Sequence, residues 1–400
     1  MARPYRIISG DSHLDLAPDR WTHCVPAKWR ERAPRRVKMA SGEEAIVMEN
    51  RPIAPIGLTR SVGVAHDKLH LQIPTFENSA GTGSPEQRLR EQDQDSIDAE
   101  ILFSRMSLLR GIKEDAGYIA LNHAYNEYLA EEFCAAAPGR LIAMGVIPTT
   151  NIDDAVKELE YCAKAGLKGV ILDMFPNGKQ YPKPEDDRFW AAALDLNMAV
   201  TSHTRAGTTR FADKVPWFQY PKSGYKGDPI EQLFRFCGDA AFAVLQMAFA
   251  GVFERFPSLQ IYWAETQIGW LHFALWQIDD HYERYRHLAK GMFGLEWLTR
   301  RPSDYIRDHS LWGFLYDPIG VSTRAAVGAD KVIWGSDFAH AASDWPNSRH
   351  TIDKSFAGVP EDERYLMVAG NVIRFFHLDA EMDVNRAKSA PSQASATTSA

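Results

Sequence analysis

The chain has 400 residues, of which 45% are hydrophobic and 24% are charged, and its formal net charge is −7 at pH 7. This composition is typical of a globular protein with a large core, while the negative charge argues against nucleic acid as a partner. No apolar run is long enough for a transmembrane helix, and the N-terminus lacks the apolar core of a signal peptide. We therefore expect a cytoplasmic protein without a membrane partner.

The first predicted strand covers residues 6–10 and leads into the sequence Asp11-Ser12-His13. Because alternate side chains of a strand point to the same face, Asp11 and His13 should point the same way. A carboxylate beside an imidazole is half of a divalent-metal site. The alternative is an ordinary strand end, at which Asp11 caps the next helix and His13 has no chemical role.

The segment from about residue 31 to residue 90 differs from the rest of the chain. It contains five prolines, a Gly/Ser/Thr cluster at 79–84 and only weak hydrophobic periodicity. Long stretches without clear elements usually form functional cover or flexible insertions. We predict an irregular insertion after strand one that covers the mouth of the fold or forms a contact in a homodimer.

Beyond this insertion, predicted strands and helices alternate. The strands are 99–103, 141–147, 169–172, 198–203, 259–265, 309–316 and 331–337, and the helices are 88–96, 119–137, 151–165, 189–194, 230–256 and 269–286. Alternating units with apolar strands indicate parallel pairing, and eight of them favour a closed (β/α)8 TIM barrel. An open doubly wound sheet is the alternative, but no Gly-rich phosphate loop follows an early strand. Residues 1–383 should form this single domain, and 384–400 a disordered tail.

Polar residues stand at several predicted strand ends, where barrel enzymes carry their active sites. They are Asp11, His13, His203, Glu265 and Asp337. Taken alone, His203 could be a hydrogen-bonded structural histidine. Asp337, however, follows an apolar strand, where a carboxylate without a partner is costly. Ligand-type residues at the ends of strands one, five and eight together predict one shared site.

Three motifs resemble the amidohydrolase superfamily. They are Asp-Ser-His on strand one, Thr-Ser-His on strand five and Trp-Gly-Ser-Asp-Phe-Ala-His on strand eight. The most similar branch is the amidohydrolase-2 group, which includes aminocarboxymuconate-semialdehyde decarboxylase, and the resemblance covers about residues 5–379. It implies one divalent metal ion bound by Asp11, His13, His203 and Asp337. We expect Zn²⁺, with Mn²⁺ and Fe²⁺ as alternatives that ligand type does not separate.

Two positions depart from the pattern of this group. Many members have His or Glu in place of Asp11, and the decarboxylases carry a catalytic His on strand six where this chain has Glu265. Glu265 could be held by an arginine in a structural ion pair, or it could act as the acid/base in place of that histidine. His340, three residues after Asp337, could contact substrate or orient a ligand.

Arg205, Trp217, Tyr220, Trp312 and Trp345 are predicted in loops or at strand ends near the mouth. Aromatic walls with one guanidinium suit a flat, apolar, anionic substrate. Each tryptophan could equally be a large core residue. We take Arg205 and Trp312, together with His340, as candidate substrate-binding residues.

These features predict a metal-dependent hydrolase that acts on a small aromatic or cyclic substrate containing a carbonyl group. The metal would activate a water molecule, and Asp337 would take the proton of that water and pass it to the leaving group. The first alternative is a non-oxidative decarboxylase of an aromatic acid, in which Asp337 protonates the ring carbon. The second is a barrel scaffold without catalysis, against which the retained ligand-type residues argue.

Overall fold

The computed structural model describes residues 3–379 and 381–382, apart from gaps at 41, 43, 49–50, 56–61, 65–67, 69–74, 77–78, 105–108, 110–111, 204–238 and 295. The predictions for Arg205, Trp217 and Tyr220 lie outside the described residues, as does the predicted tail 384–400. No described helix is both long enough and apolar enough to cross a membrane.

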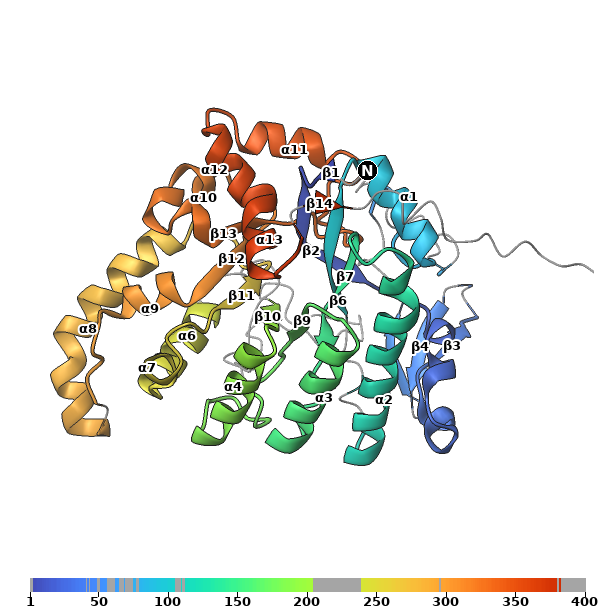
Figure 1. Cartoon of the computed structure of the whole chain (residues 1–400), viewed down its shortest axis with the longest axis horizontal. Helices are drawn as coiled ribbons and strands as arrows, with labels where there is room; N and C mark the ends of the chain where they lie inside the picture. The colour runs from blue at the N-terminus through green and yellow to red at the C-terminus, as the bar shows by residue number, and fades with distance from the viewer. Residues whose placement is uncertain are drawn as a thin grey trace, which may run out of the picture.

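Parallel strands in chain order form the centre of the molecule (Figure 1). They are β2 (Ile8–Leu14), β6 (Ala99–Ser104), β7 (Leu141–Ala143), β8 (Gly145–Val146), β9 (Gly169–Ile171), β10 (Ala199–His203), β11 (Ile261–Ala264), β12 (Ser310–Phe314) and β13 (Val332–Trp334). The predicted third strand is divided into β7, which pairs with β6, and β8, which pairs with β9. It therefore occupies one position in the barrel.

Backbone hydrogen bonds between β2 and the residues after β13 close the ring. The amide of Asp337 donates to the carbonyl of Asp11 at 2.9 Å, and the amide of His13 donates to the carbonyl of Phe338 at 2.5 Å. A parallel bridge also joins Ser12 to Phe338. The described strands thus fill the eight positions of a closed ring, and the predicted (β/α)8 barrel is confirmed.

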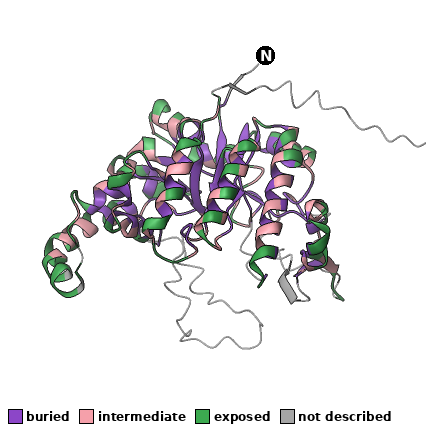
Figure 2. Cartoon of the chain, turned by 60° about the horizontal axis from the view of Figure 1, so that its bottom comes forward, coloured by how far each residue is buried: buried purple, intermediate pink, exposed green. Residues whose placement is uncertain are grey.

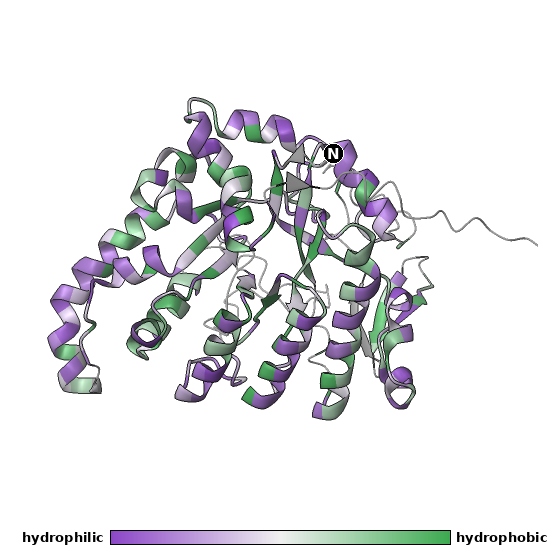
Figure 3. Ribbon diagram, viewed as in Figure 1, coloured by the Kyte–Doolittle hydropathy of each residue, from purple (hydrophilic) through white to green (hydrophobic). Residues whose placement is uncertain are grey.

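Helices cover the outside of the ring, with their buried faces toward the strands (Figure 2). The strands themselves are largely apolar (Figure 3), as expected for parallel strands covered on both sides. The helices are α1 (Pro85–Asp95), α2 (Asp115–Tyr128), α3 (Ile152–Lys164), α4 (Asp187–Asp195), α6 (Asp239–Phe249), α7 (Val252–Arg255), α8 (Leu271–Phe293), α9 (Pro302–Asp308), α10 (Pro318–Ser322), α11 (Ser348–Ser355), α12 (Glu361–Tyr365) and α13 (Asn371–Phe375).

Local sequence explains where several helices begin. Ser84 precedes α1, accepts a hydrogen bond from the amide of Gln87 and is followed by Pro85 at the first helical position. Asn151 caps α3 by accepting a hydrogen bond from the amide of Asp154 at 3.0 Å. The helix predicted over 230–256 is present as α6 and α7, and its first part lies outside the described residues.

The insertion is more regular than the sequence predicts. It contains an antiparallel sheet of β3 (Arg35–Lys38), β4 (Glu44–Met48) and β5 (Arg51–Pro55). Strands of four or five residues are too short for a clear hydrophobic period, and the prolines of β5 are accommodated because this strand is at the edge of its sheet. Later in the insertion, Val62 packs against Phe338 and Ala339, beside the end of strand eight.

Gly335 lies where the first and last strands approach each other closely. A Cβ atom at this position would be 2.5 Å from the Cβ of Asp11 and 2.9 Å from its backbone nitrogen. The strand would have to move, so Gly335→Ala should lower the free energy of unfolding by about 1–3 kcal/mol, as measured by urea denaturation. Gly291→Ala is the control, because a Cβ there would meet nothing within 4 Å. Equal stability of the two variants would contradict the prediction.

Candidate metal centre

The second half of β2 brings Asp11 and His13 to the mouth of the barrel. The pairing of β2 with β6 shifts register between Ser9 and Ser12, and such bulges often re-aim side chains beside active sites. His13 Nε2 lies 3.5 Å from Asp11 Oδ1, and both residues are buried. The predicted juxtaposition of this carboxylate and imidazole is therefore present.

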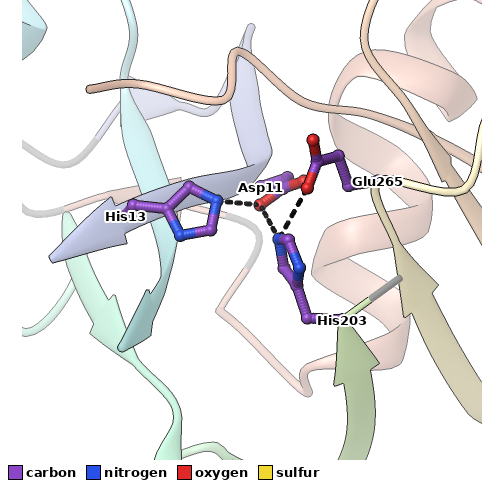
Figure 4. A group of neighbouring side chains, drawn as sticks. All are labelled: Asp11, His13, His203 and Glu265. Atoms are coloured by element: carbon purple, nitrogen blue, oxygen red, sulfur yellow. Dashed lines mark ion pairs between the residues drawn. The ribbon is translucent and has the colours of Figure 1, made fainter. Parts of the chain in front are cut away.

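The ends of β10 and β11 add His203 and Glu265 to this pair (Figure 4). His203 Nε2 lies 3.3 Å from Asp11 Oδ1 and 3.5 Å from Glu265 Oε2. One ligand atom from each of Asp11, His13, His203 and Glu265 lies within 4.8 Å of the others. Glu265 has a φ of +54°, and such left-handed backbone in a non-glycine residue is frequent at functional sites.

Asp337 follows β13 and also has a φ of +54°. Its Oδ1 lies 3.0 Å from His13 Nε2 and 2.8 Å from His340 Nδ1. The rings of His340 and His13 stack with their centroids 3.7 Å apart. The structure thus groups Asp337 with His13 and His340, while Glu265 joins the cluster around Asp11.

The protonation of the two histidines reflects the charge around them. Burial, together with the neighbouring His340, lowers the pKa of His13 to about 4, so this imidazole is neutral at neutral pH and can bind a metal. Burial also disfavours charge on His203, but Asp11 and Glu265 outweigh it and raise its pKa to about 9. The carboxylates around His203 therefore favour a positive charge at this point.

Asp337 is held in its ionised form. Burial opposes its ionisation, but the contacts with His13 and His340 outweigh this effect and keep the pKa of the carboxyl below its usual value. The same contact works in the opposite direction on His340, whose pKa is raised by Asp337 in spite of burial. Asp337 and His340 are thus an ionised carboxylate beside an imidazole that holds its proton more tightly than usual.

A divalent cation fits this set of residues. Neither side-chain oxygen of Asp11 has a hydrogen-bond partner among the described residues, nor has His203 Nε2, although all three atoms are buried. Buried polar atoms without partners are costly and often mark a missing ion. Carboxylate oxygens and imidazole nitrogens suit Zn²⁺, Mn²⁺ or Fe²⁺, so the donor set is consistent with a transition-metal site.

Trp312 and Trp345 are the aromatic candidates within the described residues. Trp312 is fully buried in β12, and its ring packs between those of Trp263, at 6.4 Å, and Trp270, at 5.6 Å. It packs the barrel against the start of α8 and contributes nothing to the exposed surface of the mouth. A strand tryptophan can face either side, and only the register decides which. Trp345 packs against Phe338, between the insertion and strand eight.

Two further residues at the site are not predicted by the sequence motifs. Phe103 on β6 is buried, and its ring lies 5.3 Å from that of His203. Arg88 on α1 donates a hydrogen bond to the carbonyl of His13 at 2.9 Å and pairs with Glu100. The only sequence signal for Arg88 is Glu100 itself, a charged residue in an apolar strand that requires a partner.

Comparisons with known proteins identify the family that the chain resembles. The family model described as amidohydrolase matches residues 77–378. The 2-amino-3-carboxymuconate-6-semialdehyde decarboxylase of Dictyostelium discoideum is 21% identical over 297 residues, which cover 74% of this chain and 77% of that protein.

Solved structures of similar fold span almost the whole chain. An amidohydrolase from Mycobacterium avium subsp. paratuberculosis has a TM-score of 0.72 at 17% identity, covering 93% of this chain and 99% of its own. The 5-carboxyvanillate decarboxylase of Novosphingobium aromaticivorans, whose structure contains manganese and a nitrobenzoic acid, has a TM-score of 0.64 at 14% identity and covers 94% of this chain and 97% of its own. At these identities the structures support the fold alone.

Proposed function

The chain belongs to the amidohydrolase family, as its strand motifs predict, and from this premise we propose that it is a metal-dependent decarboxylase of a small aromatic acid. The observation that carries the proposal is the close grouping of Asp337, His340 and His13, a set of side chains that could hold a metal ion. The comparisons favour this alternative over the predicted hydrolase, because the curated relative and a structural neighbour are named as decarboxylases.

The site offers an anionic aromatic substrate a charge partner in apolar surroundings. The metal ion would be held by Asp11, His13, His203 and Asp337, and it supplies electrostatic attraction for a carboxylate and an adjacent hydroxyl. Phe103 is buried beside His203 and makes the surroundings of this ligand candidate apolar.

Decarboxylation requires a proton at the ring carbon that loses its carboxylate. Because Asp337 is ionised at rest, it must first accept the proton, and His340 Nδ1 is the donor that faces its Oδ1 at 2.8 Å. We assign to Asp337 the transfer of this proton to the ring carbon as the carbon–carbon bond breaks and CO2 leaves. Glu265, on the other side of His203, is assigned as a second acid/base that serves the substrate hydroxyl.

Hydrolysis is the second candidate, and two observations favour it. The resting ionised form of Asp337 is that of a general base ready to take a proton from water. Glu265 also stands where decarboxylases of the resembled group carry a histidine. In this reading Asp337 would accept the proton of the attacking water and return it to the leaving group.

A single assay separates the two reactions. The protein, loaded in turn with Zn²⁺, Mn²⁺ and Fe²⁺, would be incubated with panels of hydroxylated aromatic acids, amides, esters and lactones, and the products analysed by mass spectrometry. Decarboxylation gives a product lighter by one CO2, whereas hydrolysis adds the mass of one water. Turnover confined to the amides, esters or lactones would overturn the proposal in favour of the hydrolase.

Metal binding is tested independently of turnover. His203→Ala should reduce the bound transition metal from about one ion per chain to a small fraction, because an imidazole ligand is lost. The measurement is elemental analysis after reconstitution and gel filtration. His309→Ala is the control, since His309 is a buried histidine whose Nδ1 donates a hydrogen bond to the carbonyl of Leu259, at the other end of the barrel. Absence of metal from the unmodified protein would contradict the prediction.

A further inference from the structure

Arg88 is a buried cation that contacts both sides of the barrel seam. The seam is the place where the residues that follow β13 meet β2. Its side chain is 2% exposed although it carries a full charge. Nη1 donates to the carbonyl of His13 at 2.9 Å, and Nη2 donates to the carbonyl of Phe338 at 3.3 Å. His13 belongs to the first strand and Phe338 directly follows Asp337, so one guanidinium joins the two segments that carry these ligand candidates.

The plane of this guanidinium is itself fixed. Nε and Nη2 of Arg88 donate to the two oxygens of Glu100 at 2.6 and 3.1 Å, a bidentate pair. Gln92 also donates to Glu100, at 2.7 Å, and the Arg88 guanidinium lies 4.4 Å from the centroid of the Phe338 ring. Because a guanidinium is planar and rigid, fixing one edge against Glu100 aims its remaining N–H groups at the two carbonyls.

This contact matters because the seam has little sheet structure of its own. β13 ends at Trp334, and beyond it the segment that carries Asp337 is joined to β2 by an isolated bridge, two backbone hydrogen bonds and the hydrogen bonds of Ser336 with two serines of β2. The 3.0 Å separation between His13 Nε2 and Asp337 Oδ1 depends on how these segments lie relative to each other. A small shift of either segment would change that separation, and metal affinity is sensitive to such shifts.

We propose that Arg88 is a positioning residue that sets the relative placement of His13 and Asp337 and thereby the metal affinity of the site. This inference rests on the metal site of the proposed function and does not depend on the reaction catalysed. It also links α1, the helix at the end of the insertion, to the chemistry at the mouth. Through Arg88, displacement of α1 would be transmitted to two ligand candidates at once.

Lysine should not replace Arg88 in this role. An ammonium group keeps the charge but lacks the planar fork that pairs with both oxygens of Glu100 while also reaching two carbonyls. Arg88→Lys should therefore weaken metal binding by about 10–100-fold, the range usual for residues that orient metal ligands. The dissociation constants for Zn²⁺ and Mn²⁺ would be measured by competition with a chelator, on the full chain and without substrate.

Arg140→Lys is the matched control. Arg140 is also buried, pairs with Asp93 at 2.7 Å and donates to the carbonyl of Asp98 at 3.0 Å, but it precedes β7 at the opposite end of the barrel. Its replacement should destabilise the fold to a similar degree and leave both dissociation constants within about twofold. A general loss of stability would change the metal dissociation constants of both variants to a similar degree. A positioning role of Arg88 changes those of Arg88→Lys alone.

The results of these metal-binding measurements test the role of Arg88 separately from the proposed function. If the unmodified protein and Arg88→Lys bind metal equally well, or if Arg140→Lys loses as much affinity, Arg88 is not a positioning residue. Should Arg88→Lys fail to fold, Glu100→Gln replaces it, since this change frees the guanidinium while preserving side-chain volume, and unchanged affinity in that variant overturns the inference. A protein that binds no metal overturns both proposals, whereas metal binding without decarboxylation overturns only the proposed function.

Discussion

Asp337→Asn should reduce kcat for decarboxylation by about 10³-fold or more, because the amide cannot accept and deliver the proton that the ring carbon requires. The substitution preserves side-chain size, but it removes the negative charge that faces His13 and His340. We therefore expect the fold to remain intact and the chemical step to fail. The measurement is steady-state release of CO2, with the metal content of the same sample determined in parallel.

Asp95→Asn is the matched control for this variant. Asp95 is also a buried aspartate, and it accepts hydrogen bonds from the amide and hydroxyl of Ser348 at 2.9 and 2.6 Å, far in sequence from strand eight. Its replacement should leave kcat within about twofold of the unmodified protein. If Asp337→Asn kept its metal and retained more than a tenth of the original kcat, the assignment of the proton transfer to Asp337 would be contradicted.

The barrel could be predicted from the sequence because its signals are local. Apolar strands alternate with helices from residue 99 onward, and each strand that is followed by a polar residue carries that residue to the same end of the ring. This is why the sequence predicts one shared site for the ligand-type residues at the ends of strands one, five and eight. The small sheet within the insertion has no such signal, since its strands are short and two of its residues are prolines.

The sequence predicts ligand candidates at the strand ends, but not how these residues are grouped. Strand alternation places Asp11 and His13 on one side, yet it does not reveal that Glu265 approaches His203 while Asp337 pairs with His340. These contacts depend on the angles at which loops leave the strands, and on the left-handed backbone of Glu265 and Asp337. Sequence spacing gives no access to such angles.

Tertiary contacts between distant segments were equally inaccessible. Arg88 contacts residues 75 and 250 positions away, so no pattern near α1 indicates its partners. Trp312 shows the opposite case, in which a residue at a promising strand position faces the helices instead of the mouth. In both cases the register of the barrel strands decides which residues the side chain contacts, and this register is a property of the whole ring.

The role of Glu265 can be decided by one substitution. Glu265→Gln should reduce kcat by about 10²–10⁴-fold, the usual contribution of a general acid or base, while the metal content stays unchanged. The carboxylate is buried beside His203 at the position where the decarboxylases of the resembled group carry their catalytic histidine. Glutamine keeps the shape of the side chain and its ability to contact His203, but it can no longer carry a proton.

Glu158→Gln provides the comparison for Glu265→Gln, because Glu158 is a buried carboxylate on α3 that accepts a hydrogen bond from Asn126 at 2.7 Å and faces no ligand candidate. It should leave kcat nearly unchanged. Loss of metal from Glu265→Gln would instead identify Glu265 as a ligand, in keeping with its place in the cluster of Asp11, His13 and His203. Full activity with full metal content would make Glu265 structural, and the proton transfers would then depend on Asp337 and His340 alone.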